Sequence, residues 1–136
     1  MLSLKNKLVS AKSLLLVKYP FFGSILSALN LIEADGKYDY MQVKTTFTDG
    51  IDVYYFREFI EEASIREVVY ALAHEIMHII SQHPSRIGNR DPTLWNIACD
   101  FAVNGILKEE LYEVDGVLFS YKFLNMPAEI IYDRLK

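Results

Sequence analysis

The sequence contains a single cysteine, Cys99, among its 136 residues. An intrachain disulfide is therefore excluded, which fits a protein of a reducing compartment. Basic residues are also few, because 14 Lys and Arg residues stand against 18 Asp and Glu residues and leave a net charge of −4. A chain of this charge lacks the basic surface that binds nucleic acid or an anionic membrane, so we expect neither as a partner.

Long apolar runs are absent as well. The N-terminal segment is rich in leucine, but Lys5, Lys7 and Lys12 interrupt it, and its longest apolar run covers only residues 14–17. That run is too short for the core of a secretory signal. No other segment approaches the roughly 18 apolar residues of a membrane-spanning helix. We therefore expect a soluble, cytoplasmic protein.

What the sequence does contain is enough apolar material for a packed core. Hydrophobic residues make up 51% of the chain and aromatic residues 13%, which is typical of a globular protein rather than a disordered one. Repeats, low-complexity tracts and long linkers are missing. We expect residues 1–136 to form a single domain that buries its core without disulfides.

Two kinds of periodicity predict the secondary structure. Leu4, Leu8 and Ala11 recur at helical spacing, and Asp49-Gly50 separates two alternating segments, which is the strongest short-range signal of a β-hairpin. The predicted elements are helices up to residue 17 and over residues 21–34, strands over 41–47 and 51–55, and helices over 65–82, 92–110 and 126–135. This pattern predicts an α+β fold, in which helices pack with a small antiparallel β-hairpin or sheet.

Two of these helices have clear start signals. Ser64 and Glu67 have the spacing of a capping box, in which each side chain can bind the main-chain N–H of the other residue. Asp91 is a typical helix-capping residue, and Pro92 after it suits the first helical position. We therefore expect helices to begin at residues 65 and 92.

The first of these helices carries the segment His74-Glu75-Ile76-Met77-His78, an HExxH pattern. Histidines four residues apart lie one turn apart on the same helix face, close enough to bind one metal ion. Imidazole suits Zn²⁺, and tetrahedral zinc held by three protein groups leaves a position for water. Glu75 can act as general base on that zinc-bound water without being a ligand. The sequence thus predicts a zinc site with His74 and His78 as ligands and Glu75 as the catalytic residue.

The alternative interpretation is coincidence, because a pair of histidines on a surface helix usually has no function. The rest of this helix is strongly apolar between residues 68 and 80, so we expect it to be buried. Buried polar groups need partners. This favours the metal site.

Two residues compete to be the third ligand. His83 lies five residues after His78, out of helical phase, so it would require the chain to fold back sharply. Asp100 belongs to a polar stripe of the next helix, in which Asn96, Asp100 and Asn104 recur at four-residue intervals. A carboxylate there would complete a two-histidine, one-carboxylate site, and Asn104 is placed to orient a ligand histidine. Spacing alone leaves both Asp100 and His83 as candidates.

Several segments can be compared with a known family. They are residues 48–50, 54–55, 71–78, His83, Arg86, 90–91, 94–98, Asp100, Asn104 and 126–132. Together they resemble the metallopeptidase domain of bacterial and phage proteins that is often followed by a von Willebrand A-like domain. The resemblance covers roughly residues 19–135. It implies a zincin-like fold and favours Asp100 as the third ligand.

Three functions are compatible with these features. We expect first a zinc-dependent metallopeptidase that hydrolyses peptide bonds of a peptide or protein substrate. The second is a zinc-stabilised protein-binding module with weak or lost activity. The third is a zinc hydrolase acting on RNA, against which the acidic charge counts.

A zincin-like fold would also place the hairpin beside the cleft, where its edge strand could pair with an extended peptide. A catalyst of this kind needs a group that stabilises the oxyanion. The sequence offers four candidates and does not choose among them: Tyr112, Tyr121, Arg86 and His83.

Overall fold

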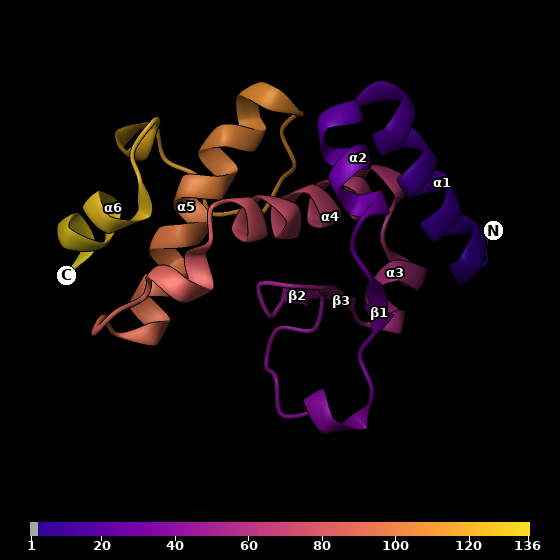
Figure 1. The fold of residues 1–136 in the computed structure, drawn as a ribbon, viewed down its shortest axis with the longest axis horizontal. Coiled ribbons are helices and arrows are strands. Elements are labelled where there is room, and N and C mark those ends of the chain that lie inside the picture. The colour runs from indigo at the N-terminus through magenta and orange to yellow at the C-terminus, as the bar shows by residue number, and fades with distance from the viewer. Residues whose placement is uncertain (1–2) are drawn as a thin grey trace.

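The computed structural model describes residues 3–136 and shows a helical protein with one small sheet (Figure 1). Its elements are α1 (Leu4–Lys18), α2 (Pro20–Ser27), β1 (Leu31–Glu33), η1 (Gly36–Tyr38), β2 (Thr46–Thr48), β3 (Val53–Tyr55), α3 (Arg57–Glu62), α4 (Ile65–Ile80), η2 (His83–Arg86), α5 (Pro92–Glu110), η3 (Tyr121–Phe123) and α6 (Ala128–Leu135). Across the described residues, none of the helices has the length and apolar character needed to cross a membrane. The predicted α+β class is confirmed.

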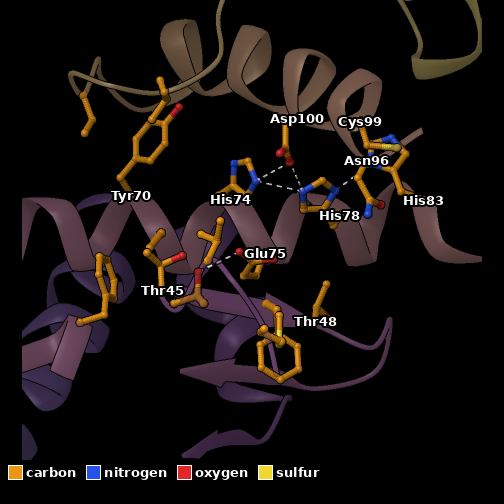
Figure 2. A pocket seen from close by; sticks show the side chains of 18 of the residues that line it. Thr45, Thr48, Tyr70, His74, Glu75, His78, His83, Asn96, Cys99 and Asp100 are labelled. Carbon is orange, nitrogen blue, oxygen red and sulfur yellow. Dashed lines mark hydrogen bonds and ion pairs between the residues drawn. The ribbon is translucent and has the colours of Figure 1, made fainter. Parts of the chain in front are cut away.

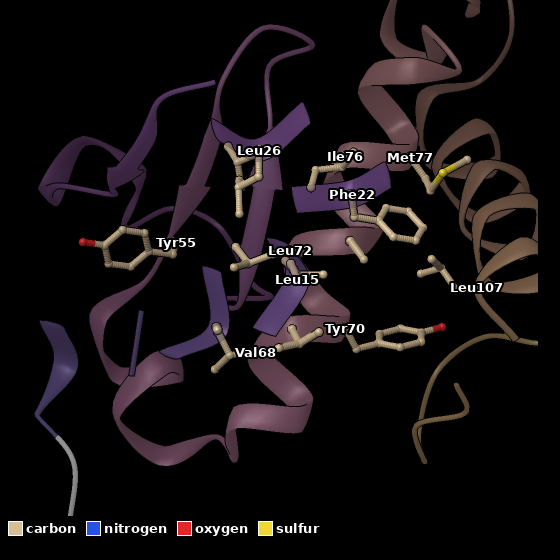
Figure 3. Packing of buried hydrophobic residues seen from close by; sticks show 14 of the residues in the cluster. Leu15, Phe22, Leu26, Tyr55, Val68, Tyr70, Leu72, Ile76, Met77 and Leu107 are labelled. Carbon is tan, nitrogen blue, oxygen red and sulfur yellow. The ribbon is translucent and has the colours of Figure 1, made fainter. Parts of the chain in front are cut away.

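Helix α4 runs through the middle of the molecule and forms the centre of the main core (Figures 1 and 3). Its side chains Val68, Leu72 and Ile76 are fully buried. Helices α1 and α2 pack against it, and the sheet lies beside it. The core is therefore built around the helix that carries the two histidines.

The predicted start of α4 is confirmed. The Ser64 hydroxyl accepts a hydrogen bond from the Glu67 N–H at 3.1 Å, and the Glu67 carboxylate accepts one from the Ser64 N–H at 3.0 Å. The helix ends at Ile80, two residues before the predicted end. The reciprocal pair satisfies two N–H groups that the first helical turn leaves without partners.

The sheet has the order β1-β3-β2. Strand β2 pairs antiparallel with β3, with Phe47 opposite Tyr54, so the predicted hairpin is confirmed although residues 41–45 lie outside the strand. Strand β1 pairs parallel with β3, with Ile32 opposite Tyr54. The sheet is thus mixed rather than antiparallel as expected, and β2 forms one of its edges.

The prediction of one helix over residues 21–34 is wrong beyond Ser27. Residues Leu31–Glu33 form β1, where the Val53 N–H donates to the Asn30 carbonyl at 3.0 Å and the Ala34 N–H to the Tyr55 carbonyl at 2.8 Å. These partners are about 20 residues away along the chain, so local periodicity carried no sign of them. Helix α3 was also not predicted.

A second cluster joins α5, α6 and η3. Its buried members include Trp95, Ala98 and Ile131. The predicted start of α5 is confirmed, because the Asp91 carboxylate accepts a hydrogen bond from the Leu94 N–H at 2.9 Å and Pro92 is the first helical residue. This cluster fixes the C-terminal part of the chain against α5.

Lys7 of α1 is a buried charged residue on the opposite side of the core. Its ammonium donates hydrogen bonds to the carbonyls of Ile60 at 3.0 Å, Glu61 at 2.6 Å and Ala63 at 2.6 Å. These carbonyls lie at the C-terminal end of α3, where a helix leaves carbonyl groups without partners and favours a positive charge. Lys7 therefore ties α1 to the end of α3.

We predict that Lys7→Met lowers the free energy of unfolding by about 3 kcal/mol, because it leaves buried carbonyls of α3 without a donor. Lys12→Met is the matched control, since Lys12 lies on the same helix and is exposed. Urea unfolding of both variants measures the difference. Equal stability of the two variants would show that the ammonium contributes no more than its aliphatic stem.

Candidate metal centre

Three polar side chains from two helices converge on one point (Figure 2). His74 and His78 project from α4 and Asp100 from α5. The Nε2 atoms of the two histidines are 2.9 Å apart, and Asp100 Oδ1 lies 3.0 Å from His74 Nε2 and 3.1 Å from His78 Nε2. The structure therefore brings together the two predicted histidine ligands and the predicted carboxylate in a group that could hold a metal ion.

The chemistry of this group fits a divalent metal. Two imidazole nitrogens and one carboxylate oxygen form a donor set that first-row transition ions accept. With bonds of 2.0–2.2 Å, tetrahedral ligand atoms are separated by about 3.3 Å. The observed triangle has sides of 2.9 to 3.1 Å, so it needs only a small expansion to accept an ion.

Asn104 determines how His74 is oriented. Its Nδ2 donates to the Leu118 carbonyl at 2.8 Å, which fixes the orientation of the amide because a carbonyl can only accept. Asn104 Oδ1 then lies 2.9 Å from His74 Nδ1 and can only accept its proton. In neutral His74 this places the lone pair on Nε2, toward Asp100, as metal binding requires. The structure thus places Asn104 where its predicted orienting role needs it.

Tyr70 is a further member of this network that the sequence analysis missed. Its hydroxyl donates to Asn104 Oδ1 at 2.7 Å. Burial, followed by the charge of Asp100, raises the pKa of Tyr70 to about 12, so the hydroxyl remains a donor. A signal existed in the sequence, because Tyr70 lies four residues before His74 on the same helix face.

Glu75 points in a different direction from the two histidines, toward the sheet (Figure 2). It is 6% exposed, and its Oε2 accepts a hydrogen bond from the Thr46 hydroxyl at 2.8 Å. Thr46 belongs to β2, so the edge strand holds the carboxylate beside the cluster. No local sequence pattern indicates this contact, because it joins residues 29 positions apart.

His83 contacts the ring of His78 but not the other two residues of the cluster. The chain turns at Gln82, which has the left-handed conformation φ 56° and ψ 36°, and the first residue of η2 is His83. Its Nδ1 lies 3.0 Å from His78 Nδ1, on the edge of the ring that faces away from Asp100. The structure therefore does not bring His83 to the point where His74, His78 and Asp100 meet.

The ionisation of the cluster follows from its contacts. Burial raises the pKa of Asp100, but hydrogen bonds from His74 and His78 and their charges outweigh burial and hold it well below its usual range. Burial lowers the pKa of His74, but the hydrogen bond to Asp100 and the charges of Glu75 and Asp100 outweigh it, so that the pKa is raised. Asp100 is therefore an anion that can neutralise part of the charge of a bound cation.

The cluster opens into a cavity of about 760 Å³ between α4, α5 and β2. Thr46 and Thr48 of β2 and Asn96 of α5 line it together with the cluster. Asn96 is exposed and lies on the cleft side of α5, one turn before Asp100 (Figure 2). The convergent donors are therefore accessible from the cavity.

The four candidates for oxyanion stabilisation are separated by the structure. Arg86 is paired with Glu129 and donates to the Ser81 carbonyl at 2.7 Å. The Tyr112 hydroxyl donates to the Arg66 carbonyl at 2.6 Å. Of the four, His83 lines the cavity of the cluster, and Arg86, Tyr112 and Tyr121 do not.

Comparisons with known proteins agree with this description. A family model described as "Putative metallopeptidase domain" matches residues 3–136. An uncharacterized protein of Thermotoga maritima is 30% identical over 93 residues, which cover 66% of this chain and 23% of that protein. The chain thus spans less than a quarter of the length of this relative. No solved structure gives a significant match.

We predict that Asn104→Leu lowers the free energy of unfolding by about 3 kcal/mol, measured in urea with a chelator present. The substitution leaves the buried Tyr70 hydroxyl and the Leu118 carbonyl without a partner. Asn96→Leu, on the same helix but exposed, should change stability by less than about 0.5 kcal/mol. A loss of similar size in both variants would mean that the Asn104 network contributes nothing specific.

Proposed function

The chain belongs to the family of putative metallopeptidase domains, and from this membership we propose that it is a zinc-dependent peptidase. The observation that carries the proposal is the convergence of two histidines and an aspartate in a cavity that the buried carboxylate of Glu75 also lines. Peptide or protein segments are the proposed substrates. The position of the edge strand β2 beside the cavity of the site supports a zincin-like fold.

We assign His74, His78 and Asp100 as the zinc ligands. When bound, zinc supplies a Lewis acid that polarises the scissile carbonyl and lowers the pKa of water. Glu75 is the general base that takes a proton from the attacking water and returns it to the leaving amine. The Thr46 hydroxyl donates to one oxygen of Glu75, so the other oxygen remains available for this proton transfer.

Asn96 is our candidate for a substrate-binding group on the α5 side of the cavity. Its amide lies one helical turn from Asp100 and faces the cavity. An uncharged amide can donate to a peptide carbonyl and accept from a peptide N–H at the same time. Asn96 would therefore orient the substrate without changing the charge of the site.

Strand β2 offers a second contact for the substrate. The Phe56 N–H donates to the Thr45 carbonyl at 3.0 Å, which makes these two residues a hydrogen-bonded pair. Bonded and non-bonded pairs alternate along an antiparallel ladder, so the N–H and C=O of Thr46 point to the free edge. An extended peptide that paired with this edge would pass over Glu75.

The first test is the metal content of the purified protein, measured by elemental analysis after zinc is supplied. We expect about one zinc per chain in the wild type, and its loss in His78→Ala and Asp100→Ala. Wild-type protein without zinc would contradict the proposed function. Zinc retained in Asp100→Ala but lost in His83→Ala would contradict the assignment of the third ligand.

Glu75→Gln separates a peptidase from a zinc-stabilised binding module. The variant should keep its zinc and lose peptide hydrolysis by at least about 100-fold, because an amide cannot take up the proton. Hydrolysis of a fluorescent peptide library at equal zinc content measures the effect. Unchanged turnover would exclude Glu75 as the base, and a zinc-loaded wild type without turnover would favour the binding module.

Thr46→Pro and Thr46→Val test the edge strand. Both variants lose the hydroxyl that contacts Glu75, but only Thr46→Pro also removes the N–H that points away from the sheet. Proline is tolerated at such a position of an edge strand. We expect Thr46→Pro to raise the KM for peptides roughly fivefold above that of Thr46→Val, the effect of one main-chain hydrogen bond. Equal KM values would exclude pairing through Thr46.

A further inference from the structure

His83 is a buried polar residue that no step of the proposed reaction uses. It is 4% exposed, and its contact within the site is the 3.0 Å approach of its Nδ1 to His78 Nδ1. The Nε2 of His78, on the other edge of the ring, lies 2.9 Å from His74 Nε2. His78 therefore stands between His83 and the metal position.

We propose that His83 is a positioning residue, whose Nδ1 accepts the Nδ1 proton of His78 and so presents the His78 Nε2 lone pair to the metal. The proposal rests on the proposed function, because it assumes that His78 binds zinc through Nε2.

The direction of this hydrogen bond follows from the number of protons. Two ring nitrogens 3.0 Å apart need one proton between them. If Nε2 of neutral His78 binds a metal, its single proton sits on Nδ1 and points at His83. His83 Nδ1 must then be the acceptor, and the proton of neutral His83 lies on its Nε2.

The surroundings of His83 hold its ring in place for this role. The Trp95 indole N–H donates to the His83 carbonyl at 3.0 Å. The rings of His83 and Trp95 meet edge to face with their centres 6.0 Å apart. The left-handed turn at Gln82 brings His83 back toward α4. Main chain and ring are therefore both fixed by groups outside the metal site.

Each of the two histidine ligands would then donate its Nδ1 proton to an acceptor outside the metal position. Asn104 accepts from His74 with an amide oxygen, and His83 accepts from His78 with an imidazole nitrogen. Neither acceptor is a carboxylate, so Asp100 is the one carboxylate within hydrogen-bond distance of the two histidines. This arrangement orients both rings without adding negative charge to the site.

The test measures zinc affinity by competition with a chromophoric chelator. His83→Phe keeps the aromatic packing but cannot accept a hydrogen bond, and we expect it to bind zinc about 10- to 100-fold more weakly than the wild type. His83→Asn supplies an amide oxygen, as Asn104 does for His74, and should recover most of this loss. Ser85→Ala, in the same turn, is the control and should bind as the wild type does.

Affinity of His83→Phe within about threefold of the wild type would overturn the proposal, as would a His83→Asn variant that folds but recovers nothing. Long-range proton–nitrogen NMR of the zinc-loaded wild type gives an independent result that needs no variant. We expect the His78 proton on Nδ1 and the His83 proton on Nε2, and a proton on His83 Nδ1 would overturn the proposal. A wild type that binds no zinc would overturn this proposal and the proposed function together, whereas the other outcomes leave the function standing.

Discussion

Helix α4 carries four polar side chains through the middle of an apolar domain, and each must find a partner there. Tyr70 and Glu75 are buried, and His74 and His78 are mostly so. Leaving such groups unpaired costs about 1–3 kcal/mol each. The described residues contain no buried side-chain donor or acceptor without a partner. The elements that surround α4 are therefore placed by polar pairing as well as by apolar packing.

These partners lie on two sides of α4, and each side contacts different residues of the site. Residues 74 and 75 point about 100° apart because an α-helix has about 3.6 residues per turn. His74 consequently faces α5, which provides Asp100 and Asn104, and Glu75 faces β2, which provides Thr46. The cavity opens between α5 and β2. A rotation of about 100° around α4 thus separates the groups that can hold a cation from the carboxylate of Glu75.

Local signals in the sequence were sufficient wherever the physical cause was local. The Ser64–Glu67 capping box and the Asp91-Pro92 start depend on neighbouring main-chain groups, and both were predicted correctly. Strand β1 was missed because its hydrogen bonds come from β3, and the helical pattern around it was equally good without them. The bond between Lys7 and the end of α3 joins residues more than 50 positions apart and left no pattern to read.

The candidate site divides in the same manner. The spacing of His74, Glu75 and His78 along one helix gave their roles as predictions, and the stripe on α5 singled out Asp100 and Asn104. The position of His83 could not be predicted, because it depends on a left-handed turn at Gln82, a residue type with no preference for that conformation. The contact of Thr46 with Glu75 depends on the packing of the sheet against α4.

The support of His74 ends on a main-chain atom, the carbonyl of Leu118. Every amino acid provides the same carbonyl, and the Leu118 side chain is 43% exposed. The contact with Asn104 therefore does not depend on which side chain occupies position 118. The length of the segment between Asn104 and Leu118 is what the site constrains. Insertions or deletions there should be selected against even where substitutions are tolerated.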